Sequence, residues 1–312
     1  MVLDTILFGD CRETLKEFDG KARTCVTSPP YYGLRDYGGE VSQIGQEQTP
    51  EEYIQNLVEV FRSVRDVLTD DGTLWVNIGD SYYNYRPGKG QALPKQTVSK
   101  TKQDLPDKCA KRGNKLEGLK EKDLIGIPWM LAFALRADGW YLRQDIIWHK
   151  PNPMPESVKD RCTKSHEYIF LLSKNRKYYY NNEAIKEPVK QDWGTRDRTK
   201  GKYHNPGTGL VPHSGLSKSY DRKNKRDVWT VTNKPYKGAH FAVYPPDLIE
   251  PCIKAGSEEG DIVLDPFMGS GTTALVSKSL NRHYIGCELH EDYGRLIQKR
   301  LSEKSFARLR LE

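Results

Sequence analysis

The 312-residue sequence lacks a long apolar run, a secretion signal and a paired cysteine motif. No apolar stretch approaches the roughly 20 residues that a membrane-spanning helix needs, and the N-terminus has no basic start followed by an apolar core and a cleavage site. The six cysteines form no C-x-x-C pair, which argues against a zinc ribbon and against a disulfide framework. We therefore expect a soluble, cytoplasmic protein with reduced cysteines, no metal and no membrane partner.

Positive charge is concentrated in two segments, although the net charge of the chain is only +7. Residues 86–123 hold eleven Lys and Arg against five Asp and Glu, and residues 186–226 hold eleven against four. The remainder is acidic, with 27 basic and 33 acidic residues. Basic segments that also carry aromatic residues are typical of a surface that binds a polyanion. The same composition also suits solvated, disordered loops, so charge alone leaves both interpretations open.

Short apolar runs alternate with longer amphipathic ones along the chain. The expected strands are 6–9, 24–27, 73–78, 142–148, 168–173, 262–264 and 284–287. The expected helices are 12–17, one that begins at Thr49-Pro50 and ends at Asp71-Gly72, 124–137, 244–255, 274–280 and 292–310. This alternation, without any internal repeat, predicts one α/β catalytic domain around a mostly parallel sheet, with room for an insertion.

A glycine-rich turn follows the expected strand 262–264. It reads Asp265-Pro266-Phe267-Met268-Gly269-Ser270-Gly271-Thr272-Thr273 and leads into a helix. This is the order strand, acidic residue, Gly-x-Gly and helix. It lets the backbone approach an adenosyl ligand closely. Glu288 ends the next expected strand, where a carboxylate can accept hydrogen bonds from both ribose hydroxyls. The alternative is an ordinary helix-capping turn beside a carboxylate with internal partners.

A second motif, Ser28-Pro29-Pro30-Tyr31, ends the expected strand 24–27. The amino group of an aromatic base is a poor nucleophile because its lone pair is delocalised into the ring. Acceptance of its two hydrogens by the Ser28 side chain and the Pro29 carbonyl would free that lone pair for attack on a methyl group. Proline fixes the backbone, and Tyr31 can stack on a base rotated out of a duplex. For this motif alone, a proline turn with a surface tyrosine remains the alternative.

Together, Val26-Thr27-Ser28-Pro29-Pro30-Tyr31 and the 265–273 turn closely resemble the catalytic and cofactor motifs of DNA amino-methyltransferases. Their order resembles the permuted β class, in which the catalytic motif precedes the cofactor motif. Gly9-Asp10, the run 148–153 and the run 240–245 also resemble family signatures. The resemblance implies a circularly permuted, Rossmann-like sheet of seven strands with an inserted target-recognition region. It also implies S-adenosyl-L-methionine as cofactor and double-stranded DNA as partner, in a bacterial, archaeal or phage-infected cell.

Residue by residue, the resemblance assigns three sets of site residues. The catalytic residues are Ser28, Pro29, Pro30 and Tyr31. The cofactor residues are Asp265, Phe267, Gly269, Gly271 and Thr272, with Glu288 on the ribose, Asp10 near the adenine and Phe241 near the methionine. The resemblance gives Trp148, Lys150 and Asn152 as a support for the flipped base or its backbone. We expect Arg196, Arg198, Lys200 and Arg222 to bind DNA as well, from their charge and their position between the catalytic and cofactor motifs. A core role for Trp148 remains equally open, and no residue is assigned to a metal.

The domain organisation follows from the same resemblance. Residues 1–85 form the catalytic half, 86–123 a basic insertion that clamps DNA, and 124–181 the remaining catalytic strands and helix. Residues 182–236 form the target-recognition region, and 237–312 form the cofactor-binding half. In the recognition region we expect arginines to read base edges and lysines to contact phosphates. A cognate restriction endonuclease and a homodimer are partners that the resemblance leaves open.

The sequence leaves three alternative functions open. A cytosine C5 methyltransferase needs a thiolate nucleophile, and Pro251-Cys252 offers one, although within an expected helix. Related Pro-Pro-Tyr motifs also serve RNA and protein-glutamine methylation. A catalytically inactive DNA-binding module is the third. Within the amino-methyltransferases, serine at the first motif position favours cytosine N4, and adenine N6 remains nearly as well supported.

Overall fold

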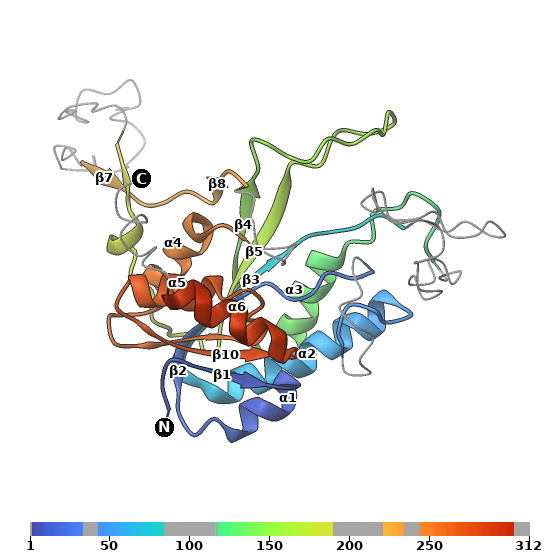
Figure 1. Ribbon diagram of the computed structural model, residues 1–312. Coiled ribbons are helices and arrows are strands. Elements are labelled where there is room, and N and C mark those ends of the chain that lie inside the picture. Colours follow the sequence, from blue (N-terminus) through green and yellow to red (C-terminus); the bar gives the residue numbers. More distant parts are fainter. Residues whose placement is uncertain are drawn as a thin grey trace, which may run out of the picture. The chain divides into compact units, whose positions relative to one another are not determined.

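The computed structural model describes residues 2–33, 43–83, 116, 118–189, 221–233 and 244–302. The chain forms two compact units, one of Met1–Tyr180 with Asp227–Glu312 and one of Asn181–Arg226. The larger unit contains the main sheet and all of the longer helices (Figure 1). No helix in these described ranges is long and apolar enough to cross a bilayer.

The larger unit is built on one sheet of eight strands among the described residues. In spatial order these are β1 (Thr5–Phe8), β10 (His283–Glu288), β9 (Ile262–Asp265), β2 (Ala22–Thr27), β3 (Leu68–Ile78), β5 (His166–Ser173), β4 (Tyr141–His149) and β8 (Val228–Thr230). All adjacent pairs are parallel except those of β5, which is antiparallel to β3 and to β4. The expected seven-stranded, permuted sheet is confirmed, with the short β8 added at its edge.

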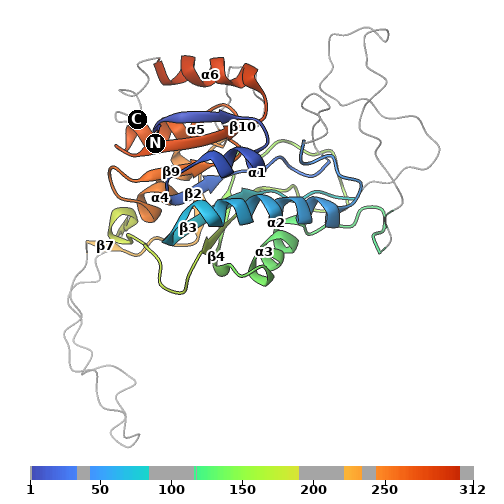
Figure 2. The same cartoon turned by 90° about the horizontal axis from the view of Figure 1, so that it is seen from below.

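Helices cover both faces of this sheet (Figure 2). On one face lie α1 (Cys11–Thr14), the 3-10 turn η1 (Leu15–Glu17), α2 (Pro50–Val67) and α3 (Ile127–Ala137). On the other lie α4 (Pro246–Gly256), α5 (Thr272–Ser279) and α6 (Glu291–Ser302). Adjacent residues of β10 point to opposite faces of the sheet. Ile285 packs in the core that includes α2, whereas Tyr284 packs with Met268 and Ile297. Burial of both sheet faces explains why these strands are continuously apolar.

Helix α2 begins as the sequence predicts. The Thr49 hydroxyl accepts a hydrogen bond from the Glu52 N–H at 3.1 Å, and Pro50 occupies the first turn. The predicted end near Asp71-Gly72 is wrong, because the helix stops at Val67 and β3 begins at once with Leu68. Leu68 pairs with Ala22 of β2, so pairing in the sheet ends the helix earlier than the apolar pattern suggests.

The smaller unit has little regular structure among its described residues. It contains the 3-10 turn η2 (Glu183–Ile185) and a two-stranded antiparallel ladder of β6 (Glu187–Pro188) with β7 (Arg222–Lys223). An ion pair of 3.1 Å between Arg226 and Glu187 supports the ladder. The unit's bounds lie close to the 182–236 region expected to recognise DNA, and that function stays a prediction.

Candidate functional site

The carboxyl ends of the parallel strands meet at one edge of the sheet, and the motif residues follow those ends. Asp10 follows β1, Ser28 follows β2 and the glycine-rich turn follows β9. The reversed strand β5 begins at the same edge, so Glu167 at its start joins them. In open α/β folds ligands bind outside the carboxyl ends of the strands. This edge is therefore the candidate active site.

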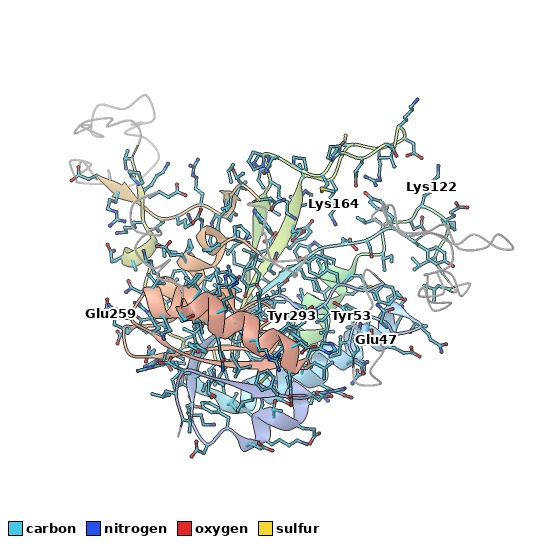
Figure 3. All side chains as sticks on the ribbon, in the orientation of Figure 1. Glu47, Tyr53, Lys122, Lys164, Glu259 and Tyr293 are labelled. Carbon is cyan, nitrogen blue, oxygen red and sulfur yellow. The ribbon has the colours of Figure 1, made fainter. Side chains whose placement is uncertain are left out.

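Two contacts fix the catalytic segment that follows β2. The hydroxyl of Tyr53, buried on α2 and labelled in Figure 3, donates to the Pro30 carbonyl at 2.7 Å. The Thr27 hydroxyl donates to Asp265 Oδ1 at 2.6 Å. The first contact holds the proline backbone against α2, and the second connects the catalytic segment directly to the glycine-rich turn. The two motifs, far apart in sequence, thus form one site.

The Tyr31 side chain lies in a tight space beside β3 and β5. Its hydroxyl donates to Glu167 Oε2 at 2.7 Å and is 3.4 Å from Asn77 Oδ1. A Cβ on Gly79 would lie 2.7 Å from Cε2 of the Tyr31 ring, so only glycine fits there. Burial, followed by the negative charge of Glu167, raises the pKa of Tyr31 well above its usual value. The phenol therefore remains a hydrogen-bond donor at neutral pH.

Asp265 organises the glycine-rich turn from within. Oδ1 accepts from Thr27 and from the Phe267 N–H at 3.0 Å, and Oδ2 accepts from Tyr244 at 3.0 Å and Thr273 at 2.5 Å. The side chain is buried, and burial raises its pKa while these hydrogen bonds oppose the rise. Four bonds fill the four acceptor positions of a carboxylate, so its arrangement suits shaping the turn better than contacting a ligand.

Glu288 joins the end of β10 to the same turn. Its Oε2 accepts from the Gly269 N–H at 2.8 Å, and its Oε1 accepts from the His290 N–H at 3.1 Å. Burial raises the pKa of this carboxyl, and the two backbone hydrogen bonds lower it. A carboxylate has about four acceptor positions, so each oxygen retains capacity for one further donor. Two ribose hydroxyls would match that capacity.

The other predicted cofactor residues in the described ranges lie in the glycine-rich turn or beside β10. Gly269 and Gly271 both have positive φ, 53° and 78°, and a Cβ on Gly271 would lie 2.9 Å from Cγ2 of Ile297. Thr272 is buried, and the half-buried Phe267 packs against the main core. Asp10 caps α1 beside β10, where the Gly9 N–H donates to the Glu288 carbonyl at 2.9 Å. The turn therefore requires glycine for backbone conformation and for helix packing together.

Asp10 already has a charged partner. Arg12 donates to both of its oxygens, with the shortest distance 2.6 Å. Burial alone would raise the pKa of Asp10, but the hydrogen bonds and charge of Arg12 outweigh it and lower the pKa. The carboxylate is held ionised and oriented near the expected adenine position.

The predicted DNA-binding residues do not form one group: some are buried or paired, and others are exposed. Trp148 is 4% exposed and donates from Nε1 to the Val231 carbonyl at 2.9 Å, which favours its core role. Lys150 pairs with Glu167, and the exposed Asn152 exchanges hydrogen bonds with Asn233. Arg222 is exposed on β7 and donates to the Lys186 carbonyl at 2.8 Å. Four predicted residues lie outside the described ranges: Phe241, Arg196, Arg198 and Lys200.

Several site residues were not found from the sequence. Glu167 and Asn77 bind the Tyr31 hydroxyl, and Tyr244 and Thr273 bind Asp265. Arg300 on α6 donates to Ser270 Oγ at 2.8 Å and to Thr272 Oγ1 at 2.9 Å. Glu167 would have been found had the antiparallel direction of β5 been known, because that direction brings the start of β5 to the site edge. Nothing in the sequence alone identified Arg300.

The rival thiol is in the wrong place for a nucleophile. Cys252 is 1% exposed inside α4, and its Sγ donates to the Leu248 carbonyl of the same helix at 3.8 Å. Among the described residues no group of three or more His, Cys, Asp and Glu could hold a metal ion. A cytosine C5 mechanism therefore has no support from this cysteine.

A mostly parallel sheet whose edge joins a Gly-x-Gly turn to Ser-Pro-Pro-Tyr defines a Rossmann-like amino-methyltransferase. The N6_N4_Mtase family, DNA methylase, matches residues 22–299. Type II methyltransferase M.SmaI of Serratia marcescens is 47% identical over 302 residues, covering 95% of this chain and 90% of that protein. M.XycI of Xanthomonas campestris pv. cyanopsidis is also 47% identical, covering 95% and 87%. The chain therefore belongs to this family of DNA methylases.

Solved structures show the same fold at lower identity. The cytosine-N4-specific PvuII DNA methyltransferase has a TM-score of 0.62 at 17% identity, covering 99% of this chain and 90% of that one. A complex of M1.HpyAVI with SAM has a TM-score of 0.51 at 20% identity, covering 95% and 99%. The predicted fold and family are confirmed. Membership in a DNA methylase family also favours DNA over the RNA and protein-glutamine substrates considered from the sequence.

Proposed function

We propose that the chain transfers a methyl group from S-adenosylmethionine to N4 of a cytosine rotated out of double-stranded DNA, at a specific sequence. The observation that carries the proposal is the hydrogen bond from Thr27 to Asp265, which ties the Ser28-Pro29 acceptors to the glycine-rich turn. A base held at one motif would then face a methyl donor held at the other. Serine at position 28, where adenine enzymes more usually have aspartate, supports cytosine N4.

The residues present fit S-adenosylmethionine. Glu288 has acceptor capacity for the ribose hydroxyls, and its bond to the Gly269 N–H keeps it beside the turn. Asp10, fixed by Arg12 next to the end of β10, would lie on the adenine side. Phe241 is proposed for the methionine side from the family signature alone. Asp265 would act by holding the turn, through its four internal hydrogen bonds.

When bound, the cofactor supplies an electrophilic methyl group. Ser28 Oγ and the Pro29 carbonyl accept the two amino hydrogens of the base, which directs the nitrogen lone pair toward that group. Tyr53 holds the next carbonyl, that of Pro30, and so orients the proline backbone. The Tyr31 ring stacks on the rotated base, with its hydroxyl held by Glu167.

We further propose that DNA lies across this edge and that residues 182–236 read its sequence. Arg196, Arg198 and Arg222 would contact bases and Lys200 phosphates, while residues 86–123 clamp the backbone. The relatives' names, Type II methyltransferase, support a cognate restriction endonuclease as partner, and with it a cytoplasmic location. The homodimer stays a prediction, which sedimentation equilibrium tests.

Nucleoside mass spectrometry tests the proposed base. Duplex DNA containing many sequence contexts is incubated with the protein and methyl-labelled S-adenosylmethionine, then digested to nucleosides. We expect label in N4-methylcytosine. Label in N6-methyladenine instead would contradict the assignment from Ser28 while leaving the amino-methyltransferase function in place, and label in 5-methylcytosine would contradict both.

A further inference from the structure

The carboxylate of Glu167 connects three segments of the candidate active site. It stands at the start of β5, directly opposite Trp148 in the β4–β5 ladder. One oxygen, Oε2, accepts from the Tyr31 hydroxyl at 2.7 Å and lies 3.4 Å from Asn77 Nδ2. The other, Oε1, pairs with the Lys150 ammonium. Its side chain is only 14% exposed, so these partners largely replace water.

On the Tyr31 side, the surroundings leave little freedom. The carbonyl of Pro30 is held by Tyr53, and the ring edge lies so close to Gly79 that a Cβ there would be 2.7 Å from Cε2. Asn77 is itself fixed, since its Nδ2 donates to the Tyr168 carbonyl at 3.1 Å. The backbone before the ring and the surface beside it are both fixed, so the remaining variable is the tilt of the ring. The hydroxyl's bond to Glu167, at 2.7 Å, is shorter than its 3.4 Å contact with Asn77.

With its other oxygen, Glu167 holds a cation, the Lys150 ammonium. The Lys150 Nζ lies 4.2 Å from the centre of the Trp148 ring, a distance at which a cation is attracted to an aromatic face. Trp148 is anchored by its bond to the Val231 carbonyl. The ammonium is therefore fixed by an anion and by a rigid ring, and is 16% exposed.

We propose that Glu167 is a positioning residue for methyl transfer: it sets the tilt of the Tyr31 ring with one oxygen and the position of the Lys150 ammonium with the other. The two groups that would meet the rotated nucleotide, a stacking ring and a cation, are then adjusted together. A hydrogen bond to a charged group is directional and strong enough to hold such geometry. The inference rests on the proposed function, because the ring and cation are assigned to a nucleotide.

The test is a double-mutant cycle between Glu167 and Tyr31, measured as kcat for methylation of duplex DNA. Glu167→Asp keeps the charge but withdraws it by one methylene, so it cannot reach Tyr31 and Lys150 together. Glu167→Gln keeps the reach and an acceptor for Tyr31 but loses the ion pair. Glu250→Ala on α4 removes an exposed glutamate that also pairs with a lysine, and serves as the control.

We expect Glu167→Asp and Tyr31→Phe each to lower kcat by about tenfold, the effect of one lost charge-assisted hydrogen bond. The double variant should be no slower than the slower single one, because both changes remove the same contact. Glu167→Gln should recover most of kcat and raise KM for DNA instead. S-adenosylmethionine affinity should match that of the Glu250→Ala control.

Two results would overturn the proposal. One is unchanged kcat in Glu167→Asp. The other is a double variant whose loss equals the product of the single losses, since that would make the two residues independent. A wild-type protein that methylates RNA or protein rather than DNA would instead refute the proposed function, and the cycle could still be measured on that substrate.

Discussion

Tyr31 shows how one side chain can combine an apolar and a polar role. Its ring is placed at the end of β2, while its hydroxyl points to Glu167 and Asn77 on neighbouring strands. Burial and the charge of Glu167 raise the pKa of Tyr31, so the hydroxyl stays protonated and donates at neutral pH. The contributions of the ring and the hydroxyl to activity can therefore be measured separately by substitution.

Tyr31→Ala should be far more damaging than Tyr31→Phe. Loss of stacking on one base costs roughly 1–3 kcal/mol, which corresponds to roughly 5- to 150-fold in rate. Phenylalanine keeps the ring and loses only the hydrogen bonds of the hydroxyl, to Glu167 and Asn77, which corresponds to the roughly tenfold loss expected above. Alanine loses the stacking in addition. Single-turnover methylation rates of the two variants decide this, and equal losses would refute the stacking role.

The pH dependence of cofactor binding should follow Glu288. Its pKa is raised by burial, so its protonation on acidification begins above the usual carboxyl range. An ionised carboxylate accepts from both ribose hydroxyls, whereas the protonated form loses acceptor capacity. Affinity for S-adenosylmethionine should thus be full above the raised pKa and fall as the pH drops through it.

The free energy of unfolding without cofactor should depend on pH in the opposite direction. Because the folded pKa of Glu288 is raised, its stabilising contribution is full below the unfolded pKa and is lost as the pH rises through the folded pKa. Calorimetric titrations and thermal melts across this pH window measure both trends. Glu288→Gln should flatten them, and an identical affinity profile in the glutamine variant would contradict this assignment.

At the scale of elements, α6 holds the glycine-rich turn from outside the motif. Arg300 donates to the Ser270 hydroxyl and to the Thr272 hydroxyl, and Ile297 fills the space that a side chain on Gly271 would need. Gly294 on the same helix faces Phe8 of β1, where a Cβ would lie 2.5 Å from Cζ. The last described helix therefore couples β1, the turn and α5.

Arg300→Ala should weaken S-adenosylmethionine binding by about tenfold, since the turn loses hydrogen bonds from a charged donor. Arg295 lies on an exposed part of the same helix, so Arg295→Ala is the matched control. Isothermal titration calorimetry gives both affinities. If the two variants bind the cofactor equally well, α6 does not support the turn in this way.

The sequence predicted most elements because their apolar periods are strong and their caps are local. The Thr49 cap and the helix 50–67 illustrate this, as does the strand that delivers Asp265. It could not predict that β5 runs antiparallel, because direction depends on which strands pair. That direction brings Glu167 to the site edge, so the partners of Tyr31 became visible only in three dimensions. The partners of Asp265, from β2, α5 and the segment before α4, were hidden for the same reason.

At the scale of the whole molecule, we predict that arginines recognise the DNA sequence and lysines bind its phosphates. Arg196→Ala with Arg198→Ala, in the region outside the described residues, should relax discrimination between cognate and single-mismatch duplexes by about 1–3 kcal/mol per lost base contact. Lysine substitutions at Lys200, Lys202 and Lys218 should instead lower the salt dependence of binding for all sequences. Unchanged rates and discrimination in the double arginine variant would mean that recognition lies elsewhere.

The central claim is that two distant motifs form one site with separate duties. Label transfer from methyl-labelled S-adenosylmethionine to duplex DNA, measured together with calorimetric cofactor affinity, tests it most directly. We predict that Ser28→Ala transfers little label but binds the cofactor as the wild type does, whereas the Gly269→Val, Glu288→Ala double variant loses both. Full transfer by Ser28→Ala, or wild-type cofactor affinity in the double variant, would contradict the account.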